Sequence, residues 1–398
     1  MSLHSPFNHE DFFGAYLSEI DPSQSYVIEA VTGGLVNWTS RATKLPSSSP
    51  GKFGNHKSLI LKHAPPYIAA IGESAKFSPY RQTIEAQALA LFGPSGNVPN
   101  VAAQSQISVP DLLHHDASAH VLIMSDLGRL HNLTQRLHSL QTQSLVSTLK
   151  SPTQELEASY SQIGTRLGSF FAALHSQSTI STIGSSRLSI FQNPDARTAV
   201  YENNVAPIEE FLHHYSFEDS AELAARVTAD FHAIDGNQVF SFGDAWSGAV
   251  ILSNDEGPDS QPTTGVVDWE FANIGRGLNG DMAQLLADLH SYLLEYAPGE
   301  VTYVAVKALM KGISSSYRQR RRITEPEWEI GVLRSAFILH GRELIVAGAA
   351  AEEKTEECRK VKVKKGVWYL RTASKDISEF EAGKWREDEV LIGLVLGD

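Results

Sequence analysis

The chain changes character about one third of the way along, and this change constrains the fold more than any other feature. Short apolar runs bounded by turn residues, typical of β-strands, dominate the first part, and amphipathic helical periodicity dominates the rest. The first part has predicted strands at 26–30, 36–42, 58–62 and 121–124 and predicted helices at 9–20 and 80–92. The later part has predicted helices at 154–177, 281–296, 301–317, 326–352 and 376–395 and a small β insert at 239–242, 249–252 and 265–271. We therefore predict an α+β fold of two lobes that meet near residues 126–129, with a β-rich N-terminal lobe over 1–127 and a mostly helical C-terminal lobe over 128–398.

The chain is acidic, which excludes several classes of partner. Its 398 residues carry a formal net charge of −13 at pH 7. Binding to nucleic acid or to an anionic membrane depends on basic side chains and is therefore not expected. The single cysteine, Cys358, excludes an intramolecular disulfide and a cysteine zinc site. No apolar run reaches the roughly 18 residues of a membrane span, and the first 20 residues lack the pattern of a signal peptide, so we expect a cytoplasmic protein.

One dinucleotide-type motif is present, Gly275-Arg276-Gly277-Leu278-Asn279-Gly280. The carboxylate of Asp281 stands where the phosphate-binding helix would begin, and it would repel a pyrophosphate. The preceding strand carries Asp268 and Glu270, and no series of βαβ units surrounds the motif. These features favour a glycine-rich turn capped by Asp281, and a dinucleotide-dependent oxidoreductase remains the weaker alternative.

Two features of the N-terminal part suit a nucleotide. The turn Thr32-Gly33-Gly34 lies between two predicted strands, and its glycines allow backbone N–H groups to approach phosphates, although a simple glycine hairpin fits equally well. Lys62 ends an apolar strand and therefore needs an anionic partner, for which Glu85 in the next helix is the natural candidate. Such a pair would position the lysine on ATP phosphates, and a surface lysine is the alternative.

The β insert carries three further carboxylates. Asp244 follows an apolar strand in a glycine-flanked turn, where it could orient or deprotonate a substrate hydroxyl or simply cap the turn. Asp268 and Glu270 follow 24 and 26 residues later, with Trp269 between them. Because side chains alternate along an extended segment, both carboxylates are predicted to project from the same side, and their oxygens would suit Mg²⁺.

The order of these motifs resembles that of the aminoglycoside phosphotransferase and choline kinase superfamily, which has a protein-kinase-like fold. Residues 59–67 and 72–74, together with the Asp-x-Glu-Phe form of residues 268–271, resemble 5-methylthioribose kinases. The run Asp244-Ala245-Trp246-Ser247-Gly248 resembles fungal 4-hydroxytryptamine kinase-like proteins. The resemblance extends from about residue 25 to 290 and is weaker through 326–352.

The resemblance implies an ATP- and Mg²⁺-dependent phosphotransferase that acts on a hydroxyl of a small molecule. It implies that Asp244 is the catalytic residue and that Asp268 and Glu270 hold the metal. The residues expected at the nucleotide are Gly33, Gly34, Asn37, Lys62, Glu85, Met124, Ser125 and Leu127. The residues expected near the acceptor substrate are Trp246, Arg334, Arg342 and Glu343.

Two positions depart from the superfamily pattern. Phe242 replaces the usual histidine before Gly-Asp, and Ala249 replaces the usual metal-binding asparagine five residues after the catalytic aspartate. An alanine cannot bind magnesium, so a kinase-like protein that binds nucleotide without phosphoryl transfer, or one that has moved to other chemistry, is the competing hypothesis. Sugars, choline-like amino alcohols and hydroxyaromatic amines all stay open as acceptors, and the sequence does not indicate an oligomeric state.

Overall fold

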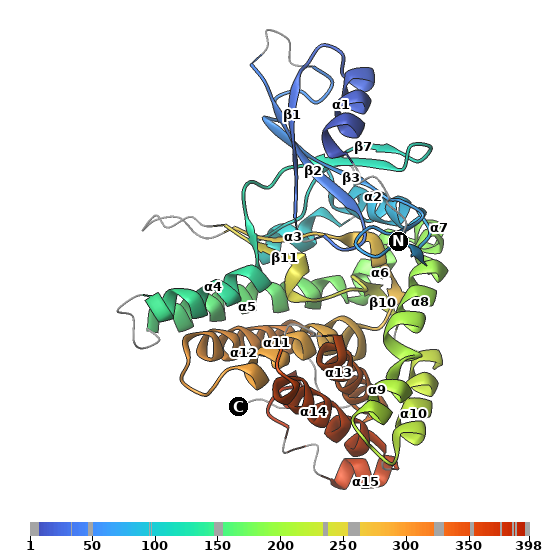
Figure 1. Ribbon diagram of the computed structural model, residues 1–398, viewed down its shortest axis with the longest axis vertical. Helices are drawn as coiled ribbons and strands as arrows, with labels where there is room; N and C mark the ends of the chain where they lie inside the picture. Colours follow the sequence, from blue (N-terminus) through green and yellow to red (C-terminus); the bar gives the residue numbers. More distant parts are fainter. Residues whose placement is uncertain are drawn as a thin grey trace.

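A strand-rich lobe rests on a larger helical lobe (Figure 1). The computed structural model describes residues 8–32, 34–46, 51–94, 96, 98–146, 154–233, 238–253, 263–321, 330–350, 354–374, 376–383, 386 and 388–394. Gly33, predicted to contact a nucleotide, lies outside the described residues. The predicted class, a β-rich N-terminal lobe followed by a mostly helical part, is confirmed.

The N-terminal lobe is built on a five-stranded antiparallel sheet with the order β1-β2-β3-β8-β7. Its strands are β1 (Tyr26–Ala30), β2 (Trp38–Lys44), β3 (Ser58–His63), β7 (Leu112–Asp116) and β8 (Val121–Ser125). The lobe also contains the helices α1 (His9–Ile20), α2 (Arg81–Phe92) and α3 (Pro99–Ser105) and a hairpin of β4 (Tyr67–Ile68) and β5 (Gly72–Lys76). Of these, β4, β5, β7 and α3 were not predicted from the sequence.

Alternation along β3 sends its side chains to opposite faces of this sheet. Leu59 and Leu61 pack with Phe13 of α1 in one apolar cluster. Ile60 packs against the other cluster, which contains Ile84 of α2. Residues two apart share a face, so Lys62 is directed to the side that α2 covers.

The C-terminal part contains a longer set of elements. Its helices are α4 (Leu133–Val146), α5 (Gln154–Leu174), α6 (Gln177–Ile183), α7 (Ser185–Leu188), α8 (Pro194–Val200), α9 (Ile208–His214), α10 (Ser220–His232), α11 (Ala283–Glu295), α12 (Val301–Arg321), α13 (Ile330–Ala350), α14 (Glu356–Ser374) and α15 (Ile377–Ala382). Its strands are β9 (His131–Asn132), β10 (Val239–Ser241), β11 (Val250–Leu252), β12 (Thr264–Val266) and β13 (Asn273–Gly275). β12 and β11 continue a four-stranded sheet from β6 (Ile107–Ser108) to β9, and β10 pairs with β13.

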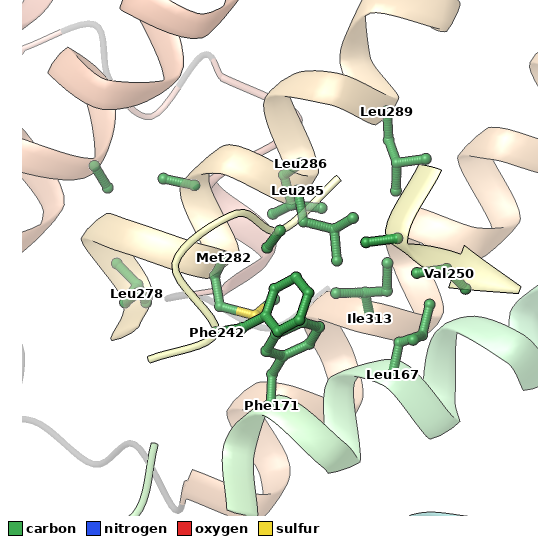
Figure 2. Packing of buried hydrophobic residues seen from close by; sticks show 14 of the residues in the cluster. Leu167, Phe171, Phe242, Val250, Leu278, Met282, Leu285, Leu286, Leu289 and Ile313 are labelled. Atoms are coloured by element: carbon green, nitrogen blue, oxygen red, sulfur yellow. The ribbon is translucent and has the colours of Figure 1, made fainter. Parts of the chain in front are cut away.

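Helices α5 and α12 approach each other closely through glycines. A Cβ atom on Gly164 would lie 2.1 Å from the Leu309 backbone oxygen, and one on Gly168 would lie 2.2 Å from that of Ile313. Only glycine permits this contact, which fixes the central pair of helices in the lobe. Above the pair, Phe171, Phe242 and Met282 pack together with the leucines of α11 (Figure 2).

Near the C-terminus one helix was missed and one prediction was wrong. α14 was not predicted, because the lysines at 360, 362, 364 and 365 interrupt its apolar pattern. A single helix over 376–395 is not formed: α15 ends at Ala382, and Gly383 is extended (φ −100°, ψ −162°). Within the described part of the chain, no helix is long and apolar enough to cross a membrane.

Candidate active site

Lys62 meets carboxylates from both lobes. Its Nζ lies 2.7 Å from Glu85 Oε1 of α2 and also donates to a carboxylate oxygen of Asp268. Gln82, three residues before Glu85 on the same face of α2, donates from Nε2 to the Lys62 backbone oxygen at 2.9 Å. The structure therefore places Lys62 beside Glu85, as the sequence suggested, and adds Asp268 from the C-terminal lobe.

Negative charge exceeds positive charge around Lys62. Burial alone would lower the pKa of Lys62, but the surrounding carboxylates of Asp268, Glu85 and Glu270 outweigh burial and raise it. Burial raises the pKa of both Glu85 and Glu270. Glu85 Oε2 is buried and accepts no hydrogen bond from the residues that the structure describes. Three carboxylates thus face the two cations Lys62 and Arg81, and a bound cation would reduce this imbalance.

Arg81 is buried and connects several segments of the site, a role that the sequence did not reveal. It is 1% exposed, and its Nε lies 3.8 Å from Glu270 Oε2. The guanidinium donates to Asn37 Oδ1 at 3.0 Å and to the backbone oxygens of Val36, Tyr67, Phe77 and Ser78 at 3.1, 3.3, 2.9 and 2.9 Å. Arg81 therefore fixes the segment after the glycine turn to the start of α2 and to Glu270. An arginine in the first turn of a helix is ordinarily exposed, so no pattern in the sequence indicates this role.

Asp268 and Glu270 do not lie on an extended strand, and that prediction was wrong. Asp268 is left-handed (φ +69°, ψ +60°), and Trp269–Phe271 forms one 3-10 turn. The two carboxylates consequently have different partners: Asp268 contacts Lys62, and Glu270 accepts a hydrogen bond from Asn37 Nδ2. The turn begins soon after β12 ends, and two-residue alternation does not continue beyond the strand.

These carboxylates provide suitable donors for a hard divalent cation. The Asp268 side chain is 38% exposed, so its carboxylate oxygens are accessible to a metal ion, and they lie beside the buried carboxylates of Glu85 and Glu270. Glu270, at 5%, is nearly buried and is held by Asn37. The described residues contain no group of three or more His, Cys, Asp or Glu side chains arranged to hold a metal. Mg²⁺ usually takes one or two carboxylates and completes its shell with phosphate oxygens and water, so the residues present fit Mg²⁺ that arrives with a nucleotide.

Asp244 follows β10 in a tightly constrained turn. The preceding Gly243 has φ +87°, and a Cβ atom there would lie 2.1 Å from the Phe271 backbone oxygen. Phe242, before it, is 1% exposed and packs edge-on against Trp269 with ring centroids 4.8 Å apart. The glycine thus lets the turn press against the turn that carries Asp268 and Glu270.

Asp281, which precedes α11, and two side chains of α11 hold this turn in place. Asp281 accepts from the backbone nitrogens of Phe242 and Gly243 at 2.7 and 2.8 Å, and it also contacts His175 Nε2 at 2.9 Å. Gln284 donates from Nε2 to Asp244 Oδ1 at 3.0 Å. Further along, Gln284 Oε1 accepts from Ala245 N and Asp288 Oδ2 accepts from Ser247 N, at 3.2 and 2.9 Å. The backbone of the turn is therefore held by side-chain oxygens of Asp281 and of α11, which the sequence did not reveal.

The carboxyl group of Asp244 is adapted to proton exchange near neutral pH. Burial, and next the charge of Glu343, raise its pKa to about 7. The hydrogen bond from Gln284 acts in the opposite direction. A carboxylate with this pKa can accept a proton from a hydroxyl more readily than an ordinary aspartate.

A cavity of about 350 Å³ opens beside Asp244. Arg342 is among its lining residues, and its guanidinium also contacts Glu343. Arg334, predicted near the acceptor, is not among the lining residues and donates from Nε to the Ala373 backbone oxygen at 2.6 Å. Trp246, also predicted there, lies over Gly248, where a Cβ atom would be 2.2 Å from the indole ring. Of the predicted acceptor residues, Arg342 is the one that the structure places on the cavity.

Met124, Ser125 and Leu127 connect the two lobes. Met124 and Ser125 end β8, where the Ser125 hydroxyl accepts from Asp111 N at 2.8 Å. The following residue, Asp126, accepts two hydrogen bonds from Arg41 of β2, at 2.6 and 3.1 Å. This ion pair holds the chain that leaves β8 against β2.

The Gly275–Gly280 motif has the structure of a turn rather than of a dinucleotide site. β13 pairs antiparallel with β10, and the residues after it form a π turn over Gly277–Met282. Asp281 is buried and engaged in holding the turn before Asp244. The glycine-rich turn favoured by the sequence is therefore present, although Asp281 holds the neighbouring turn rather than capping its own.

Comparison with known proteins follows this geometry. No family model matches the chain. Two curated sequences match it: the 4-hydroxytryptamine kinase of Psilocybe cyanescens at 24% identity over 261 residues, and that of Psilocybe cubensis at 26% over 274 residues. The chain is similar to small-molecule kinases. Each match covers 66% of this chain, and the chain spans about two thirds of the length of these relatives, 66% and 67% respectively.

Kinases also occur among the solved structures that resemble this one. A choline kinase from Cryptosporidium parvum aligns over 91% of this chain and 94% of its own, with a TM-score of 0.48 and 12% identity. The sequence resemblance to fungal 4-hydroxytryptamine kinase-like proteins is confirmed.

Ala249, which stands where the superfamily pattern has a metal-binding asparagine, lies in the core. It is 1% exposed, and its backbone oxygen accepts a hydrogen bond from Val267 N at 3.0 Å.

Proposed function

We propose that this chain is an ATP- and Mg²⁺-dependent phosphotransferase that acts on a hydroxyl group of a small molecule. The observation that supports it most is the convergence of Lys62, Glu85 and Asp268 between the lobes, with Asp244 on an adjacent cavity. The similarity to two 4-hydroxytryptamine kinases supports the same activity and gives hydroxyaromatic amines priority among the three acceptor classes.

In this proposal each residue acts through position or charge. Lys62, oriented by Glu85, contacts the phosphates of ATP. Asp268 and Glu270 would hold Mg²⁺, which supplies positive charge for the phosphate oxygens. Asp244, fixed by Gln284, orients the acceptor hydroxyl and accepts its proton.

The replacement Asp244→Asn tests this assignment. We expect turnover to fall by about two to four orders of magnitude, because proton transfer to the carboxylate is lost. The affinity for ATP should change little. Turnover is measured by phosphate transfer to sugars, amino alcohols and hydroxyaromatic amines, and nucleotide affinity by calorimetry. Undiminished turnover in the variant would disprove the role of Asp244.

A nucleotide-binding protein without transferase activity is the second candidate. Ala249 supports it, because its methyl group cannot replace the metal-binding amide of the superfamily. Stabilisation by ATP and Mg²⁺ without transfer to any acceptor of the three classes would favour this second function over the first.

A further inference from the structure

The cavity beside Asp244 has an apolar wall that comes from the N-terminal lobe. Val36, Ile68 and Phe77 line it, although they precede Asp244 in the sequence by more than 160 residues. Phe271 of the C-terminal lobe extends this wall, with its ring centroid 5.6 Å from that of Phe77. Ile68 belongs to the β4–β5 hairpin, so the hairpin contributes directly to the cavity.

The helical lobe contributes both polar and apolar residues to the cavity. Asn203, Asn204 and Arg197 line it from the helical lobe, and Arg276 lies there paired with Asp230 at 2.8 Å. Val200, Phe231 and Ile338 of the same lobe add apolar surface, so a molecule that fills the cavity meets hydrocarbon from both lobes and hydrogen-bonding groups from the helical one.

The apolar wall is attached to the segment that follows the glycine turn. Ala69 and Ala70 of the hairpin donate from their backbone nitrogens to the backbone oxygens of Val36 and Leu35, at 3.1 and 2.9 Å. Arg81 donates to the backbone oxygens of both Val36 and Tyr67. The hairpin and this segment are thus joined by hydrogen bonds on two sides, which holds Ile68 in a defined position.

We propose that the β4–β5 hairpin is the specificity element of the acceptor site and that it selects acceptors in which the hydroxyl is attached to an apolar ring system. This inference rests on the proposed function, since it concerns the acceptor of the same site. A ring placed against Val36, Ile68 and Phe77 removes apolar surface from water. A sugar placed there would lose hydration of its hydroxyl groups without gaining hydrogen bonds from the wall. The wall thus favours aromatic acceptors over sugars and choline-like amino alcohols.

The proposal is tested by binding and by transfer, with 4-hydroxyindole, glucosamine and choline as probes. Calorimetry in the presence of a non-hydrolysable ATP analogue and Mg²⁺ gives acceptor affinity independently of catalysis. We expect 4-hydroxyindole to bind most tightly and Ile68→Ala to weaken it by about tenfold, because most of the contact area of one side chain is lost. Ile68→Phe, which narrows the cavity, should also weaken it. Ile71→Ala is the matched control, since Ile71 is on the same hairpin, is 59% exposed and does not line the cavity.

The outcomes separate this inference from the proposed function. Selective loss of 4-hydroxyindole binding in both Ile68 variants, with Ile71→Ala unchanged and all proteins equally folded by circular dichroism, supports the specificity role. Tighter binding of glucosamine or choline than of 4-hydroxyindole, or unchanged affinity in the Ile68 variants, overturns it. Absence of phosphate transfer to all three probes contradicts the proposed function, while the calorimetric affinities still decide the role of the hairpin.

Discussion

The missing Cβ atom of Gly243 and the carboxyl group of Asp244 together determine the geometry and chemistry of this turn. Gly243 combines a positive φ with a backbone approach that leaves no room for a Cβ atom, whereas Asp244 has a carboxyl group whose pKa is raised to about 7. The close approach at Gly243 positions the carboxyl group of Asp244, because the turn must lie against Phe271 for the carboxylate to reach the cavity. Both properties depend on contacts that the local sequence does not contain.

Gly243→Ala should therefore damage the site more than an ordinary glycine replacement. Gly184 is the matched control, since it also has a positive φ (+79°) but no atom within 4 Å of a Cβ position. For Gly184→Ala we expect a loss of about 1 kcal/mol in the free energy of unfolding, from backbone strain alone. For Gly243→Ala we expect at least about 2 kcal/mol, because strain and overlap add, together with a large loss of turnover. Urea unfolding of both variants measures the difference, and equal losses would contradict the close approach.

The raised pKa of Asp244 predicts a pH dependence. If this carboxylate accepts the hydroxyl proton it must be ionised, and the ionised fraction falls below its pKa, so kcat/KM should drop about tenfold between a plateau above pH 8 and pH 6. Glu343→Gln removes a charge that raises this pKa, and the acid limb should move to lower pH. Glu222→Gln, at a side chain that is 70% exposed and paired with Arg226, is the control and should leave the profile unchanged. An unshifted limb in Glu343→Gln would show that another group controls the rate.

At the scale of elements, α2 connects the parts of the site. Its first turns carry Arg81, Gln82 and Glu85, which contact Asn37, the Lys62 backbone and the Lys62 side chain respectively. One short helix therefore fixes both the segment after the glycine turn and the lysine of β3. A shift of α2 would move both together.

Arg81→Met tests this connection. It would leave one side-chain oxygen and four backbone oxygens without their buried donor and Glu270 without its arginine, so we expect a loss of about 3 kcal/mol or more in the free energy of unfolding. Arg129→Met is the control: Arg129 pairs with Glu29, but its side chain is 72% exposed, so the loss should stay below about 1 kcal/mol. Urea denaturation measures both variants. A small effect at Arg81 would mean that water can replace its hydrogen bonds.

The contrast between Lys62 and Arg81 shows how far the sequence predicts this site. Lys62 follows an apolar strand, where charge is costly, and this position indicated both a buried partner and the helix that supplies it. Arg81 follows Pro79 and Tyr80 at a helix start, where arginine is common. Three of its five acceptors, on Asn37, Val36 and Tyr67, come from segments distant in the sequence. Similarly, some elements with regular apolar spacing, such as β3 and α5, were predicted, whereas α4 and α6 to α10 were not, and the turn at Asp268 depends on tertiary contacts. Contacts between segments that are distant in the sequence could not be predicted from the sequence pattern.

At the scale of the whole molecule, the two lobes meet through charged groups at the proposed nucleotide site. Lys62 and Asn37 of the N-terminal lobe contact Asp268 and Glu270 of the C-terminal lobe, respectively. The surplus of carboxylates means that these contacts leave negative charge uncompensated. The Mg²⁺ ion that accompanies a nucleotide would bring positive charge to these carboxylates, so nucleotide binding and the cohesion of the lobes should depend on the metal.

This dependence can be measured by thermal unfolding with ADP, in the presence of Mg²⁺ or of a chelator. A ligand at about 100 times its Kd stabilises the native state by about 2.7 kcal/mol, so the melting temperature should rise by several degrees with ADP and Mg²⁺ and by less with chelator. In Asp268→Asn the metal-dependent increment should be lost, because the accessible oxygen anion is removed, while the response in chelator is retained. Asp219→Asn, at a surface pair with Arg371, is the matched control and should keep the increment. If wild-type protein gains equal stability with and without Mg²⁺, then the carboxylates do not hold a metal, and the surplus charge must be balanced by protonation of Glu85 or Glu270, whose pKa values burial already raises.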